Sequence, residues 1–325
     1  MWVLLGQRMI KSIPAWYIFN GEAGGAYPVG TFQNEVCRLW STHMSHLNLR
    51  RSMVFAASLL ALGVLANIAS ATHSWGGYHW ARTTPQFTLK LGNNLSSSDW
   101  QLRLSQASVD WNAAPTPVLL TAVVAGQSSK RCGMVSGTTQ VCNSTYGSNG
   151  WLGLASINIS GGHITQGSAK MNDTYFNTST YNNPNEKQHV MCQEIAHTFG
   201  LDHQSTDGSS QNSCMDYFSN TGANATSTLS TKPNSHDFDE LNIIYAHLDS
   251  TSTVSTTLVT RPSTAAEGND DPNSWGLLMS QSNNGRSSTY EAFNRDGSKT
   301  ATHVYWTSEA ASKCSSCDHR YDNGH

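Results

Sequence analysis

The sequence predicts an α+β domain over about residues 72–249, and two observations along the chain carry this prediction. Between residues 85 and 171, segments with alternating or β-branched apolar residues recur, which is typical of strands. Between residues 185 and 248, apolar residues recur at the three- and four-residue spacing of helices. Strand segments followed by helices indicate an α+β class.

The strands follow from short apolar patterns. Phe87, Leu89 and Leu91 alternate along the first of them, and the next segment is rich in β-branched residues. A loop or hairpin is expected between Cys132 and Cys142. The expected strands are 85–91, 118–124, 151–159 and 164–171, and short strands at 277–280, 289–293 and 302–306 are expected to form a small β appendage.

Helix starts are marked by capping residues. Ser98 is expected to cap a helix that buries Trp100, Leu104, Ala107 and Trp111. A second helix is expected from about Asn185 to His197 or Thr198, ending before Gly200. A third, capped by Asn234 or Ser235, is expected to turn Phe238, Leu241, Tyr245 and Leu248 to the core.

Composition excludes one class of function. The 325 residues carry 19 Lys plus Arg and 22 Asp plus Glu, a formal charge of −3, so the basic excess of nucleic-acid binders is absent. Only 13% of residues are charged, and the 38% that are hydrophobic suffice for a core.

The N-terminal region has the features of a secretory signal peptide. Met53–Ala66 is apolar except for Ser58, follows Arg50 and Arg51, and precedes Ala69-Ser70-Ala71. A start at Met44 gives a normal signal, so we expect an upstream extension at 1–43, a signal peptide at 44–71 and a secreted chain. A retained signal anchor and a buried core helix are the alternatives; we expect no stable membrane partner.

The cysteines agree with secretion. Removing residues 1–71 removes Cys37 and leaves an even number of cysteines, as expected in an oxidising compartment. Six cysteines permit 15 connectivities, and we propose the sequence-local one. Its pairs are Cys132 with Cys142, Cys192 with Cys214, and Cys314 with Cys317. Asn-x-Ser/Thr glycosylation sequons occur at Asn94, Asn143, Asn158, Asn172, Asn177 and Asn224.

The domain organisation follows from composition. Residues 72–249 hold the strands, the helices and the motif described next. Residues 250–271 begin with a Ser/Thr-rich stretch, which is typical of a flexible linker. Residues 272–325 are expected to be a small accessory segment or tail.

One motif carries chemistry. Residues 193–203 read Gln-Glu-Ile-Ala-His-Thr-Phe-Gly-Leu-Asp-His. Gln193 and His197 are one helical turn apart, so both can face one ion, with Glu194 beside them. Gly200 permits the sharp turn that ends the helix and brings His203 back to the same ion.

This motif resembles the metzincin zinc-protease signature His-Glu-x-x-His-x-x-Gly-x-x-His, which it matches at every defined position except Gln193. Ser213-Cys214-Met215-Asp216-Tyr217 resembles the Met-turn of that family. The resemblance implies a zincin-like catalytic domain with a twisted mixed sheet, an active-site helix and a Met-turn.

The resemblance also implies residue roles. A secreted zinc metalloendopeptidase is expected, with Glu194 as general base, His197 and His203 as zinc ligands, and Met215 as the floor beneath them. Tyr217 is a candidate ligand or transition-state donor, or else a core tyrosine. The substrate is expected to be a peptide or protein bound as an extended strand along 151–159, and the enzyme to be a monomer.

Gln193 leaves three possibilities open. In the first, the Gln193 side-chain oxygen coordinates zinc. In the second, His197 and His203 hold the ion with another donor. In the third, the chain is a non-catalytic secreted binding protein on the same fold. His189 lies about 12 Å from His197 along a straight helix, too far to share an ion. Cys192 as a ligand is the rival to its disulfide, but it points about 100° away from position 193.

The remaining candidates are weaker. Cys314-Ser-Ser-Cys317 with His319 is half of a zinc knuckle without a second pair, so a local disulfide or a tail is expected. His163, His236 and His247 have no partners at metal-ligand spacing in the sequence and are expected to be surface or core histidines.

Overall fold

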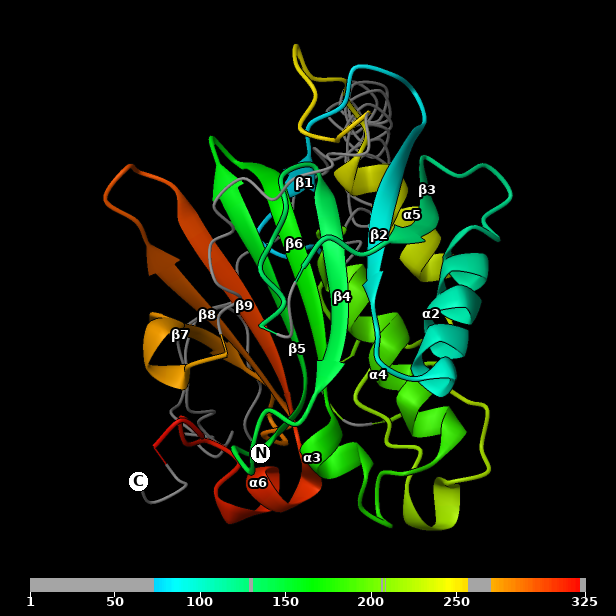
Figure 1. The fold of residues 1–325 in the computed structure, drawn as a ribbon, viewed down its shortest axis with the longest axis vertical. Coiled ribbons are helices and arrows are strands. Elements are labelled where there is room, and N and C mark those ends of the chain that lie inside the picture. Colours follow the sequence, from blue (N-terminus) through cyan, green and yellow to red (C-terminus); the bar gives the residue numbers. More distant parts are fainter. Residues whose placement is uncertain (1–72, 129–130, 206, 208, 257–269, 322–325) are drawn as a thin grey trace, which may run out of the picture. The chain divides into compact units, whose positions relative to one another are not determined.

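A computed structural model describes residues 73–128, 131–205, 207, 209–256 and 270–321. The expected upstream extension and signal peptide, and most of the linker, lie outside the described residues. The α+β class is confirmed, with a nine-stranded mixed sheet (Figure 1). No helix of the described part is long and apolar enough to cross a membrane.

The sheet combines a parallel half and an antiparallel half. Its order is β3-β2-β4-β6-β5-β9-β8-β7, and β1 pairs with β6 off this path. The pairs among β1, β2, β3, β4 and β6 are parallel, whereas β5, β7, β8 and β9 pair antiparallel. The bounds are β1 His79–Trp80, β2 Phe87–Asn94, β3 Leu119–Ala125, β4 Thr138–Ser144, β5 Trp151–Ser160, β6 His163–Asn172, β7 Leu277–Gln281, β8 Ser287–Phe293 and β9 Lys299–Trp306.

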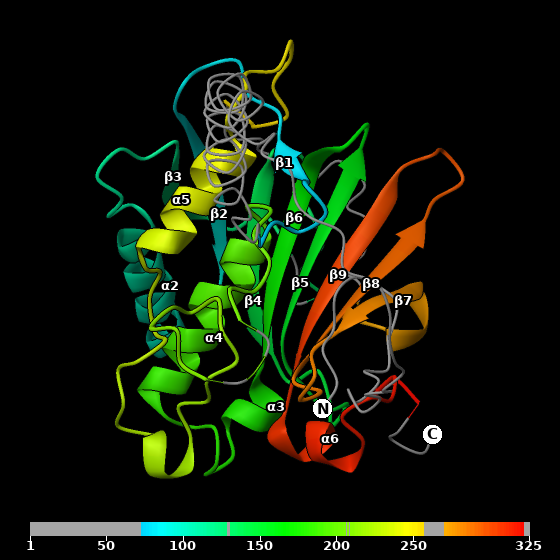
Figure 2. The ribbon, with the colours of Figure 1, turned by 180° about the vertical axis from the view of Figure 1, so that it is seen from behind.

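Helices α2, α4 and α5 lie on the same side of the sheet (Figure 2). The helices are α2 Ser98–Trp111, α3 Asp173–Phe176, α4 Pro184–His197, α5 Ser235–Ile244 and α6 Ser308–Lys313. The buried stripe predicted for α2 is confirmed, although Ser97 rather than Ser98 is its cap. The predicted burial of Leu248 is wrong: α5 ends at Ile244, and the Leu248 side chain beyond it is 52% exposed.

The C-terminal strands extend the main sheet. Strand β9 pairs antiparallel with β5, from Trp151 opposite Trp306 to Ile159 opposite Lys299. The segment expected as an appendage is therefore part of the sheet. The prediction that a substrate strand lies along 151–159 is wrong, because β6 and β9 occupy both edges of β5.

The three predicted disulfides are confirmed, and they agree with an oxidising environment. The bond between Cys192 and Cys214 excludes Cys192 as a metal ligand and ties α4 to the segment before Met215. Two of the expected glycosylation sites are unsuitable in the folded chain. The amides of Asn143 and Asn172 are buried and hydrogen-bonded within the sheet region.

Lys170 on β6 gives a prediction for stability. Its side chain is fully buried, its Nζ lies 3.2 Å from Asp270 Oδ1, and burial lowers its pKa to about 8. The Lys170 ammonium loses its proton more easily in the folded chain than in the unfolded chain. The free energy of unfolding should therefore rise by about 1.5 kcal/mol between pH 8 and pH 9.5. Urea unfolding across this range measures the gain. Lys170→Met should lack it, and an identical pH slope in both chains would contradict the prediction.

Candidate metal centre

Helix α4 starts and ends at residues suited to those positions. Asn183 caps it by accepting a hydrogen bond from the Glu186 N–H at 2.9 Å, and Pro184 occupies the first turn. Gly200 reverses the chain after the helix with φ +98°. A Cβ there would lie 2.0 Å from the Tyr78 carbonyl oxygen, so the predicted glycine turn is confirmed and admits no side chain.

Three histidine side chains lie close together near the turn at Gly200. One ligand-capable atom from each of His197, His203 and His303 lies within 4.8 Å of the others, and all three residues are buried. His197 lies in the last turn of α4, His203 follows Gly200, and His303 comes from β9. The motif thus supplies two of the histidines and the C-terminal strand supplies the third.

Contacts through Nδ1 position the rings of His197 and His303. Nδ1 of His197 donates to the Leu201 carbonyl oxygen at 2.9 Å, so Nε2 carries a lone pair and has no hydrogen-bond partner. Nδ1 of His303 lies 3.2 Å from Glu194 Oε2, which orients the ring and leaves Nε2 facing the cluster. A carboxylate that holds the distal nitrogen is the usual support of a metal-binding histidine.

Burial favours the neutral form of all three imidazoles. Burial lowers the pKa of His303 to about 3 and lowers the pKa values of His197 and His203 well below the ordinary value. Neutral imidazole is the form that binds metal.

The donor set fits a zinc ion. Without a metal, Nε2 of His203 can donate to Nε2 of His303 across 2.8 Å, but Nε2 of His197 and Nδ1 of His203 then stay buried without partners. Unpaired buried nitrogens are costly, and a metal among the rings would use the His197 lone pair. Three imidazoles are a frequent ligand set for zinc with an open fourth position.

The Glu194 carboxyl lies beside this histidine cluster. It is fully buried, and burial raises the pKa of its carboxyl well above the ordinary value. Oε2 meets His303 and Oε1 has no hydrogen-bond partner. A Cβ on Gly153 of β5 would come within 2.4 Å of Oε1, so only glycine lets the carboxyl lie against the strand.

The Gln193 side chain is directed toward the segment from Cys214 to Asp216. Its Nε2 donates to the carbonyl oxygens of Cys214 and Asp216, each at 2.8 Å, and its Oε1 is buried without a partner. His189, excluded above on distance, bonds instead to the Ser230 carbonyl oxygen at 2.6 Å.

Other side chains enclose the cluster. Tyr217 packs its ring against His203 with centroids 4.1 Å apart, and Met215 is fully buried in the same core. Trp75 makes an edge contact with His197 at 5.7 Å and is 4% exposed. Ser287 of β8 places its hydroxyl 2.8 Å from His303 Nε2.

Sequence reasoning missed His303, Ser287 and Trp75. A signal for His303 existed, since it stands inside the predicted strand 302–306. His319 of the suspected half knuckle bonds instead to the Gly285 carbonyl oxygen at 2.9 Å. His163 and His247, expected to have no metal partners, lie with His79 around Asp249.

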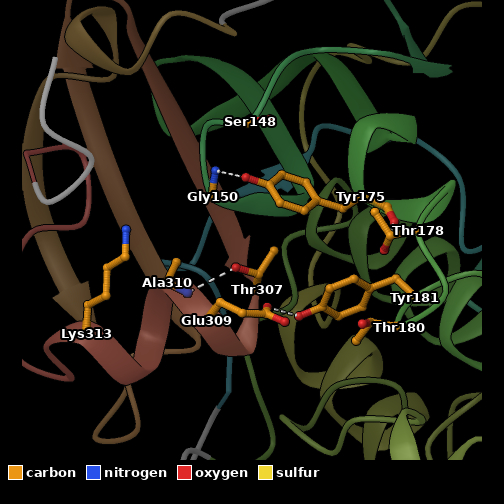
Figure 3. A pocket seen from close by; sticks show the side chains of 10 residues that line it. All are labelled: Ser148, Gly150, Tyr175, Thr178, Thr180, Tyr181, Thr307, Glu309, Ala310 and Lys313. Atoms are coloured by element: carbon orange, nitrogen blue, oxygen red, sulfur yellow. Dashed lines mark hydrogen bonds between the residues drawn. The ribbon is translucent and has the colours of Figure 1, made fainter.

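A pocket of about 310 Å³ lies elsewhere, between the segment after α3 and the start of α6 (Figure 3). Tyr175 and Tyr181 form one wall, where the Tyr181 hydroxyl donates to Glu309 Oε2 at 2.5 Å. None of the three clustered histidines lines it. Three of its hydrogen bonds join lining residues to one another: Tyr175 to Gly150, Tyr181 to Glu309 and Ala310 to Thr307.

No model of a known protein family matches the chain, and no curated protein sequence matches it. The resemblance to metzincins therefore rests on the motif from Gln193 to His203 and on the Met-turn sequence around Met215.

Proposed function

We propose that the chain is a secreted zinc-dependent metallopeptidase of the metzincin type, with His303 as the third histidine ligand beside His197 and His203. The observation that carries the proposal is the convergence of these three neutral imidazoles with the Glu194 carboxyl in one buried cluster. The disulfides support the secreted location.

In the proposed reaction, the histidines would hold the metal and Glu194 would transfer the proton. A bound zinc ion would supply Lewis-acid activation of water and of a peptide carbonyl. Glu194 holds the His303 ring through Oε2, while Oε1 is free to accept a proton and return it to the leaving amine. Burial raises the pKa of this carboxyl, which makes its ionised form a stronger proton acceptor.

A second candidate is a non-catalytic zinc protein on the same scaffold. The covered edge of β5 and the Trp75 ring over the cluster favour it, because neither leaves the substrate path expected of a peptidase. In that case zinc would join β9 to α4 and stabilise the fold.

Glu194→Gln separates these candidates. The amide can still accept the His303 hydrogen bond, so zinc content should stay at the wild-type level. Loss of the base should reduce kcat for an unstructured protein substrate by about 10²–10⁴-fold. Asp239→Asn on the exposed face of α5 removes the same charge and should change neither quantity.

Three results discriminate. Wild-type cleavage that chelators abolish and zinc restores supports the peptidase. Zinc binding without any cleavage supports the non-catalytic candidate. Full cleavage by Glu194→Gln, or by protein stripped of metal, would exclude the proposed chemistry.

A further inference from the structure

A second group of histidines surrounds one carboxylate oxygen. The Nε2 atoms of His163, His247 and His79 lie 3.1, 3.4 and 3.6 Å from Oδ1 of Asp249. Ligand atoms of His79, His247 and Asp249 all lie within 4.8 Å of one another. A carboxylate offers about two acceptor sites per oxygen, so Oδ1 cannot satisfy three imidazole N–H donors.

In the neutral form of His79, its hydrogen bond to the backbone turns the lone pair toward Asp249. Its Nδ1 donates to the Gly77 carbonyl oxygen at 3.1 Å, which places the lone pair on Nε2. That Nε2 is buried and has no hydrogen-bond partner in the described chain. A lone pair facing a carboxylate is repulsive, and a bound cation or a proton on Nε2 removes this repulsion.

Asp249 is held in place by the backbone. Its Oδ2 accepts a hydrogen bond from the Arg82 N–H at 2.9 Å, and its own N–H donates to the Arg82 carbonyl oxygen at 2.8 Å. Oδ1 is thereby directed at the three imidazoles. A ligand fixed through its second oxygen is the arrangement seen around metal sites.

We propose that His79, His247 and Asp249 form a second zinc site, separate from the His197–His203–His303 centre, with His163 bonded to the same Asp249 oxygen beside it. Two imidazole nitrogens and one carboxylate oxygen are a donor set that zinc accepts with a fourth position left open. Zinc bonds of about 2.0–2.1 Å place tetrahedral ligand atoms about 3.3 Å apart. The distances from Asp249 Oδ1 to Nε2 of His247 and of His79, 3.4 and 3.6 Å, are close to that value.

The site would join segments that are distant in sequence. His79 lies on β1, His163 begins β6, and His247 and Asp249 follow α5. The His247 side chain is 58% exposed and Asp249 is 8% exposed, so an ion can enter from one side. Zinc here would fix β1 and thereby the preceding segment, whose Trp75 covers the first centre.

The test is the zinc stoichiometry and thermal stability of the purified secreted chain. Wild type should bind two zinc ions per chain. His247→Ala and Asp249→Asn should each bind one tightly, with affinity at the second site at least about 10-fold weaker, and should lose part of the zinc-induced rise in Tm. Leu248→Ala, an exposed neighbour that offers no donor, should behave as wild type.

Zinc titration of His303→Ala shows whether the second site binds zinc when the first centre has lost a proposed ligand. One zinc retained in His303→Ala and lost in His247→Ala supports the second site even if the proposed peptidase centre fails. One zinc in wild type that survives His247→Ala and Asp249→Asn unchanged would overturn the second site.

Discussion

His303→Ala is expected to weaken zinc binding at the first centre by at least about 100-fold. Outer-shell partners of a metal already contribute 10- to 100-fold, and His303 is proposed as a direct ligand. The variant also leaves Glu194 Oε2 without its 3.2 Å partner. Competition with a chromophoric chelator measures the affinity, in wild type and in His247→Ala, so that the second site does not mask the loss.

His236→Ala is the matched control for this experiment. His236 is partly buried and belongs to neither proposed zinc site, although it stacks on His73 with ring centroids 4.8 Å apart. It should retain both zinc ions. If His303→Ala binds zinc at the first centre as tightly as His236→Ala does, His303 is not a ligand.

Gln193→Leu is expected to lower the free energy of unfolding by about 3 kcal/mol and to leave zinc affinity within a few-fold of wild type. The substitution deprives the Cys214 and Asp216 carbonyl oxygens of their buried amide donor. Each unsatisfied buried group costs about 1–3 kcal/mol. Urea unfolding of the metal-free chain and a zinc titration measure the two quantities.

Gln188→Leu on the same helix is the control. Its amide is buried, and neither of its polar atoms has a hydrogen-bond partner in the described chain, so its removal should cost little stability. A loss of zinc affinity in Gln193→Leu as large as that in His303→Ala would instead make Gln193 Oε1 a ligand.

The local features of the site could be predicted from the sequence. The extent of α4, the turn at Gly200 and the disulfide between Cys192 and Cys214 depend on neighbouring residues, on capping, or on cysteines close in the chain. For each of these three features, the residues that determine it lie within about two dozen positions of one another.

The pairing of β9 with β5 could not be predicted in the same way. It joins residues about 150 positions apart, and no local pattern specifies which strand a distant strand will meet. The Ser/Thr-rich stretch before β7 also favoured a separate appendage. Because this pairing was not predicted, β5 was expected to have a free edge and His303 was not recognised as a site residue. The cluster around Asp249 was missed for the same reason, because His79, His163 and His247 come from three distant segments.

Anomalous diffraction at the zinc edge, from crystals of the zinc-loaded chain, tests the central claim most directly. Zinc held by the three histidines should give a peak within about 2.0–2.1 Å of Nε2 of His197, Nε2 of His303 and a ring nitrogen of His203. A peak bound by His197, His203 and Gln193 Oε1 with His303 turned away, or no peak among these residues, would contradict it.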